Sequence, residues 1–173
     1  MDLLQKLSGT PALVAAVAAQ VPEALVRVRS GPFALVEHAW HMADLERDAF
    51  GERIRRLLEE EDPFLPDFDG EKVAREREYL KLDLQAALAA FGAAREENLR
   101  RLRAVAGEQR GRSGRQEGVG TVALSDMPRR MLDHDLAHLN EIADLLADLL
   151  PGHPMIEGLR AIAQGGPRSS KAA

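Results

Sequence analysis

Apolar residues recur at helical spacing along most of the chain. From residue 10 to about residue 29, alanine, leucine and valine dominate the pattern. Thr10 followed by Pro11 has the form of a helix start, because a hydroxyl can cap the first turn and a proline there has no N–H to leave unbonded. Pro22 would kink or divide the helix. We therefore expect a first helix over residues 10–29.

Three further helical patterns follow, and each stops at residues that cannot continue a helix. The second runs from residue 33 to about residue 60, where the segment DPFLP begins two positions later. The third runs from about residue 69 to residue 105. The fourth begins near Ser125 and ends near Leu150, before a Pro-Gly pair. This order of elements predicts a bundle of four long helices.

The remaining segments are short or polar. Residues 107–120 are rich in Gly, Arg and Gln, and we expect them to form a mobile connection. Residues 159–162 have room for one short helical turn, and residues 164–173 read as a disordered tail. The length of 173 residues fits a single domain, which we place over residues 1–163.

Composition narrows the class of protein. Aromatic residues make up 4% and charged residues 29%, and the apolar residues are mostly Ala and Leu, which favours an all-α fold. The absence of cysteine excludes disulfides, thiolate nucleophiles and cysteine-ligated zinc. A net charge of -5 with interleaved Arg and Glu disfavours a nucleic-acid partner. No stretch approaches the ~18 apolar residues of a membrane span, so we expect no membrane partner and a cytoplasmic protein.

Histidines are concentrated in two windows on predicted helices. His134 and His138 are four residues apart, so a helix places them on one face, in the middle of the apolar stripe of the fourth helix. His41 lies on the second helix and is expected to face inward as well. Three histidines from facing helices would hold one divalent metal ion and leave a fourth position open, as expected of reactive zinc or nickel.

Other interpretations of these histidines exist. A histidine on an apolar face is often a hydrogen-bonded core residue, and a pair four apart also arises by chance. A zincin site needs Glu directly after the first histidine, where this chain has Asp135. A di-iron site needs Glu three residues before a histidine, and no histidine in the two windows has one. Metalloprotease and di-iron oxidase are therefore disfavoured.

Nearby charges are candidates for supporting roles. Carboxylates often accept the second N–H of a ligating imidazole, and four are candidates for this role: Glu37, Asp44, Asp135 and Glu141. For Glu141 we favour a solvated helix carboxylate. Three arginines of the segment 107–120 would meet an anionic substrate if the segment reached the site, although a flexible polar segment needs no function: Arg110, Arg112 and Arg115.

Two motifs resemble those of the DinB/YfiT-like superfamily of metal-dependent four-helix-bundle proteins. The first is FALVEHAWHMADLE at residues 33–46, similar to the family's aromatic-led second helix with its His-x-x-Asp-x-Glu ending. The second is LDHDLAHLNEI at residues 132–142, similar to its final His-x-x-x-His helix. Phe33 stands where the family usually has tryptophan. The likeness spans residues 10–150.

The resemblance implies several properties of the chain. It assigns His41, His134 and His138 as the metal ligands, with Zn or Ni as the ion, and gives His38 no role. It implies a homodimer and, in some branches, transfer or isomerisation that uses a low-molecular-weight thiol such as bacillithiol or mycothiol. We therefore expect a metal-dependent thiol S-transferase acting on a small molecule, since a metal favours the thiolate of a bound cofactor.

Two alternatives stay open beside this expectation. The first is metal-dependent hydrolysis by an activated water, and the second is a non-enzymatic metal-binding dimer. His38 separates the last from the others: beside His41 in the coordination sphere it would favour a closed structural site, and facing outward it would leave a position open. The sequence does not identify the metal, the reaction or the substrate.

Overall fold

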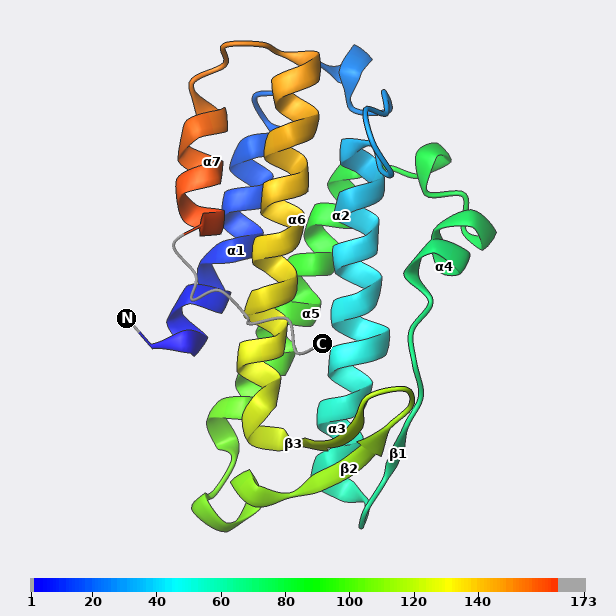
Figure 1. The fold of residues 1–173 in the computed structure, drawn as a ribbon, viewed down its shortest axis with the longest axis vertical. Coiled ribbons are helices and arrows are strands. Elements are labelled where there is room, and N and C mark those ends of the chain that lie inside the picture. The colour runs from blue at the N-terminus through cyan, green and yellow to red at the C-terminus, as the bar shows by residue number, and fades with distance from the viewer. Residues whose placement is uncertain (1, 165–173) are drawn as a thin grey trace.

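In the computed structural model, which describes residues 2–164, four long helices run side by side (Figure 1). They are α1 (Leu3–Ala18), α2 (Leu35–Asp44) with its continuation α3 (Glu52–Glu59), α5 (Leu84–Ala104) and α6 (Met127–Leu149). A π-helical segment, Leu45–Gly51, joins α2 to α3 without a break. Because α1 and α2 both pack against α5 and α6, α1 and α2 lie on one diagonal of the bundle. The expected all-α four-helix bundle is confirmed.

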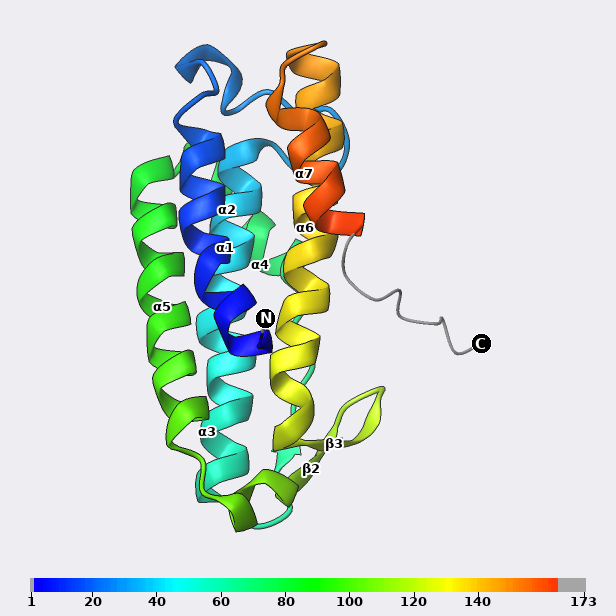
Figure 2. The same ribbon diagram turned by 90° about the vertical axis from the view of Figure 1, so that its left-hand side faces the viewer.

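Short elements close the two ends of the bundle. Helix α7 (Met155–Gln164) runs back along α6, as Figure 2 shows, and α4 (Gly70–Glu76) lies beside α2. At the opposite end from the α6–α7 turn, β2 (Ser113–Gln116) pairs antiparallel with β3 (Gly120–Ala123) and parallel with β1 (Phe64–Leu65). No helix among residues 2–164 is both long enough and apolar enough to cross a membrane.

The expected start of the first helix is wrong. The helix begins at Leu3 after Asp2, and Pro11 lies in its interior. An interior proline removes the hydrogen bond to the carbonyl four residues earlier, which is that of Leu7. Here Nη1 of Arg95 on α5 donates to the Leu7 oxygen at 2.9 Å, so the carbonyl that Pro11 leaves unbonded gains a partner from another helix.

The expectation of one helix over residues 69–105 is also wrong. Glu78 adopts a left-handed conformation with φ of 51°, which stops helical geometry just after α4. Asp83 then caps a new helix, since its carboxylate accepts a hydrogen bond from the Ala86 N–H at 2.7 Å. The chain therefore turns between α4 and α5 at residues that the apolar pattern alone does not mark.

Residues 107–120 do not form the mobile connection that we expected. After a 3-10 turn, Gly107–Gly111, they form β2, which pairs with β1, and then the turn to β3. Gly114 is buried against Pro63, where a Cβ atom would stand 2.6 Å from the proline carbonyl oxygen. This close approach explains why a segment with few apolar residues can pack.

The limits of the last helices agree with expectation in part. The fourth helix is confirmed to within two residues at each end, but the short turn at residues 159–162 is a longer helix, α7. Gln164, which we placed in the tail, ends that helix. The rest of the expected tail, residues 165–173, lies outside the described residues.

The core has two apolar clusters with polar side chains between them. One cluster gathers Val14, Leu35, Phe91 and Ile142, among others, and the second gathers Leu7, Ile54, Leu99 and Met131, among others. Between these positions each long helix carries buried polar residues. They include Thr10 on α1, His41, Asp44 and Glu46 on α2 and its π segment, Arg95 and Asn98 on α5, and Asp135 and His138 on α6.

Candidate metal centre

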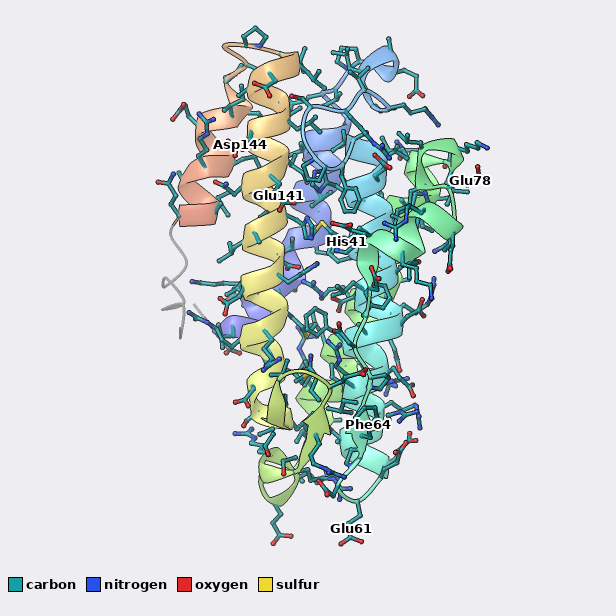
Figure 3. All side chains as sticks on the ribbon, turned by 45° about the vertical axis from the view of Figure 1, so that its right-hand side comes forward. His41, Glu61, Phe64, Glu78, Glu141 and Asp144 are labelled. Atoms are coloured by element: carbon teal, nitrogen blue, oxygen red, sulfur yellow. The ribbon has the colours of Figure 1, made fainter. Side chains whose placement is uncertain are left out.

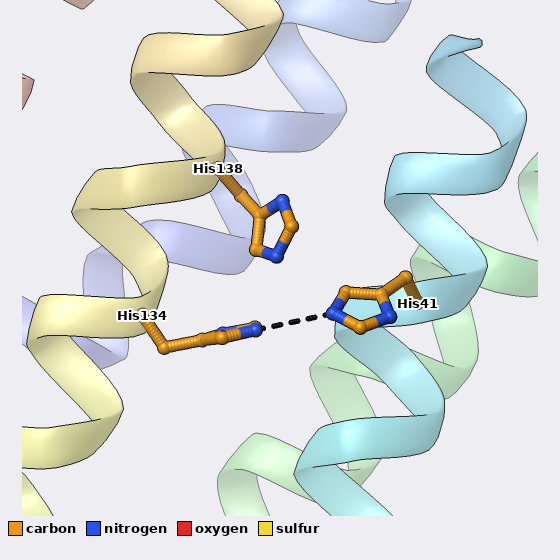
Figure 4. Close-up of side chains that lie close together, drawn as sticks. All are labelled: His41, His134 and His138. Carbon is orange, nitrogen blue, oxygen red and sulfur yellow. Dashed lines mark hydrogen bonds between the residues drawn. The ribbon is translucent and has the colours of Figure 1, made fainter. Parts of the chain in front are cut away.

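The three predicted ligands meet in this polar layer. His41 comes from α2, and His134 and His138 come from adjacent turns of α6, with one ligand atom of each lying within 4.8 Å of the others (Figure 4). The Nε2 atoms of His41 and His134 are 3.3 Å apart. The ring of His138 lies 4.4 Å from that of His134 and 4.7 Å from that of His41, between centroids. The helical spacing therefore brings the three imidazoles together as expected.

The arrangement fits a metal ion. Two imidazole nitrogens on a tetrahedral Zn²⁺, each at ~2.0–2.1 Å, stand roughly 3.4 Å apart, which matches the separation of His41 and His134. Burial lowers the pKa of His41 to about 4 and lowers that of His134. Both rings are thus neutral at pH 7 with a lone pair to offer, as a ligand must be.

His138 is oriented by a carboxylate. Its Nδ1 atom is 2.9 Å from a carboxylate oxygen of Glu141, one turn further along α6, so its Nε2 atom is the one left for a metal. This hydrogen bond lowers the pKa of Glu141. Figure 3 shows Glu141 and His41 on the neighbouring helices α6 and α2. Glu141 therefore makes the contact expected of an orienting carboxylate, while 43% of its side chain stays exposed to solvent.

His38 behaves as neither of the two alternatives anticipated. Only 1% of its side chain is exposed, so it does not face outward, and it lies outside the group formed by His41, His134 and His138. Its Nδ1 atom is 3.2 Å from Nδ1 of His138 and 3.8 Å from Glu141. With these two residues it forms a second group of three potential ligands. His38 thus contacts the Nδ1 side of His138 and not the three-histidine group as a whole.

The carboxylates expected to orient the histidines have other partners. Glu37 binds the guanidinium of Arg29 and accepts a hydrogen bond from the backbone N–H of Ala34. Asp135 makes two hydrogen bonds to Arg95, at 2.7 and 2.8 Å.

Asp44 lies three residues after His41, at the end of α2. It is bound by Arg47, Arg77 and the hydroxyl of Tyr79. Its negative charge still acts on His41 through space and opposes part of the lowering of the pKa of that ring. Asp44 therefore influences the centre electrostatically, while its carboxylate oxygens bind Arg77 and Tyr79 in the turn after α4.

Packing contacts, more than hydrogen bonds, fix the position of the His41 ring. Its Nδ1 atom is buried without a hydrogen-bond partner among the described residues. Gly70, the first residue of α4, packs against this edge so closely that a Cβ atom there would stand 2.3 Å from Cε1 of His41. The rings of Phe33 and Phe68 flank it at 5.4 and 6.4 Å. A glycine at position 70 is therefore part of the centre.

A hollow of about 330 Å³ leads to His134. Residues from the π-helical segment, α3, α6, the segment before α4 and the hairpin line it: Leu45, Phe50, Arg53, Asp67, Phe68, Gln116, Arg130, Asp133 and His134. The three arginines of the segment 107–120, Arg110, Arg112 and Arg115, do not line this hollow. The centre therefore has an approach route for a small molecule, and its arginines are not those that the sequence suggested.

A bundle of four helices with three histidines converging from two of them defines a candidate metal-binding helical protein. The chain belongs to the DinB superfamily, whose family model matches residues 6–142. Among solved structures it is similar to YfiT from Bacillus subtilis, described as a probable metal-dependent hydrolase with an unusual four-helix bundle topology. The two are 18% identical, the match covers 85% of each chain, and the TM-score is 0.77. No curated protein matches the chain.

Proposed function

We propose that the chain is a metal-dependent enzyme that holds one divalent ion, Zn²⁺ or Ni²⁺, through His41, His134 and His138. The observation that carries the proposal is the convergence of three imidazole nitrogens within 4.8 Å at the end of a hollow. A closed structural site would use a fourth protein ligand, and the residues around His134 instead leave room for a small molecule.

The residues of the chain would each contribute to the chemistry. A divalent ion, when bound, supplies Lewis acidity that lowers the pKa of a water or thiol placed on it. Glu141 holds the proton on Nδ1 of His138 and so keeps its Nε2 lone pair directed at the centre. Phe50 and Phe68 form apolar walls that limit water around a reacting group.

Hydrolysis is the reaction that we propose first. The support is the description of YfiT, a protein of the same fold, as a probable metal-dependent hydrolase. Thiol S-transfer, which the family resemblance implies, is the second candidate. The chain has no cysteine, so a low-molecular-weight thiol would have to bring the sulfur. A requirement for added thiol therefore separates the two reactions.

Metal content tests the proposal directly. The purified protein is dialysed against Zn²⁺ or Ni²⁺, and bound metal is measured by mass spectrometry for wild type, His134→Ala and His138→Ala. His153→Ala is the matched control, because this histidine lies in the turn before α7, away from the centre. We expect about one ion per chain in wild type and control, and a large loss of affinity in the other two. Equal metal binding by all four proteins would refute the proposal.

Turnover then distinguishes the reactions. The metal-loaded protein is assayed against small aryl esters without thiol and against aryl halides with a low-molecular-weight thiol. Ester cleavage without thiol that is lost in His134→Ala supports hydrolysis, and activity only with thiol supports S-transfer. The homodimer also stays a proposal, and sedimentation of the metal-loaded protein checks it.

A further inference from the structure

Two guanidinium groups line the hollow that leads to His134. Arg53 belongs to α3 and Arg130 to the first turn of α6, so the two charges approach from different helices. Each hydrogen-bonds only to neutral groups: Nη2 of Arg53 donates to the Pro66 carbonyl at 3.2 Å, and Nη1 of Arg130 donates to the Gln116 side chain at 3.0 Å. Most of their capacity to bind an anion is therefore unused within the described residues.

Arg53 is unusual for an arginine. It is only 8% exposed, and its buried Nε atom has no hydrogen-bond partner among the described residues. Burial and the nearby charge of Arg130 lower its pKa, and the attraction of Asp67 opposes this only in part. A buried charge without a salt-bridge partner is costly, so such a group calls for an anion from outside the chain.

The acidic residues of the hollow do not supply that anion. Asp133 lies 3.2 Å from Arg129, so it already has a cationic partner. Asp67 is exposed, and the salt bridges of Arg53 and Arg130 to either carboxylate are absent among the described residues. The positive charge of the two guanidiniums is thus only partly balanced.

Apart from Gln116, which accepts the hydrogen bond from Arg130, the rest of the lining is apolar and ends at His134. Leu45, Phe50 and Phe68 form the walls. The ring of Phe50 packs edge-on to that of His134 at 5.9 Å, and Phe68 lies 6.4 Å from His41. A molecule with a charged head and a small apolar body would therefore place the body between two aromatic rings and beside the histidines.

We propose that the hollow binds a small amphipathic organic oxyanion, a carboxylate or a phosphate ester, whose head is held by Arg53 and Arg130 while its apolar body lies against Phe50 and Phe68. Guanidinium groups bind both kinds of oxyanion through paired N–H donors. That this molecule is the substrate rests on the proposed function. The binding of the anion does not rest on it, because neither Arg53 nor Arg130 is a proposed metal ligand.

The test uses protein stripped of metal with a chelator, so that no anion can bind to an ion. Fluorine NMR measures the affinity of 4-fluorobenzoate, 4-fluorophenyl phosphate and uncharged 4-fluorobenzyl alcohol for wild type, Arg53→Gln and Arg130→Gln. Arg115→Gln, on β2 with its side chain 70% exposed, is the control. We expect at least one anion to bind wild type and control more tightly than the alcohol does. Its affinity should fall about tenfold or more in each hollow variant, as for the loss of a charged hydrogen bond.

The outcomes separate this inference from the proposed function. Equal anion affinity in wild type and Arg130→Gln, or equal affinity for alcohol and anions, would overturn it; Arg130 is the decisive variant if Arg53→Gln does not fold. Arginine-dependent binding in a protein that takes up no metal would support the anion site while removing the enzyme. Metal uptake without arginine-dependent anion binding would overturn the anion site and leave the proposed function standing. The stronger of the two anions identifies the head group.

Discussion

Replacing Arg95 by methionine should be among the most destabilising single changes in the chain. The Arg95 side chain is buried and donates four hydrogen bonds: two to Asp135, at 2.7 and 2.8 Å, and one each to Glu46 and the Leu7 carbonyl, both at 2.9 Å. It also lies 5.0 Å from the centre of the Phe91 ring. Methionine has similar length but no charge, so the change leaves two buried carboxylates and one carbonyl without this partner.

Removing one member of a buried ion pair typically costs about 3–5 kcal/mol, because the charge left behind is not compensated. We expect a loss of about this size in the free energy of unfolding of Arg95→Met at pH 7. The sign of its pH dependence also follows. Burial already raises the pKa of Glu46, and without the guanidinium it rises further, so Glu46 takes up a proton more readily on acidification. The cost should therefore be smaller at pH 5 than at pH 7.

Urea unfolding followed by circular dichroism measures this loss. Arg100→Met is the matched control, since Arg100 lies on the same helix, pairs with Glu97, and is 68% exposed. It should change stability little, because solvent screens an exposed pair. If the two variants lost equal stability, or if the cost of Arg95→Met grew on acidification, the interpretation of Arg95 as the centre of a buried network would be refuted.

Three further predictions concern the metal centre. Glu141→Gln should weaken metal binding about 10–100-fold in a chelator competition, because a neutral amide orients His138 less well, and unchanged affinity would contradict that role. Gly70→Ala should displace His41, lowering metal affinity and shifting the NMR signals of that ring, since the added Cβ atom would stand 2.3 Å from it. Metal-free protein should lose stability as the pH falls from 6.5 towards 4: His38 and His41, with pKa values lowered to about 3 and about 4, stay neutral when folded but take up protons when unfolded. Each contributes about 1.4 kcal/mol per pH unit in this window, and a flat urea-unfolding profile from pH 7 to pH 5 would exclude the effect.

Helix periodicity and the family resemblance together pointed to the three histidines that the structure brings within reach of one ion. His134 and His138 follow the spacing of one helical face, and His41 lies on the inward face of a long second helix. Glu141 was among the candidates to orient a histidine, and it lies three residues after His138 on the same helix. What the pattern lacked was the direction of the ring, which only the packing of α2 against α6 fixes.

Other features depend on contacts between distant segments. Arg95 and Arg100 look alike in sequence, but one is buried against three other segments and one is exposed, and only the assembled bundle distinguishes them. The strand β2 buries Gly114 and Gln116, so no alternation of apolar residues marks it. The anion-binding pair joins Arg53 and Arg130, which are far apart in the chain, at a hollow that the hairpin helps to form.

The polar layer of the core links the stability of the fold to the geometry of the metal centre. Arg95 binds Asp135, the neighbour of His134 on α6, and Glu46, which follows His41 by five residues in the π-helical segment. One buried side chain therefore joins α5 to the two helices that carry the ligands. Buried ion pairs stabilise a fold weakly relative to apolar packing. The main effect of this network is therefore to fix the distance between these helices. Imidazoles held at fixed separation before a metal arrives lose less freedom on binding it, so the network favours both a defined bundle and a preorganised centre.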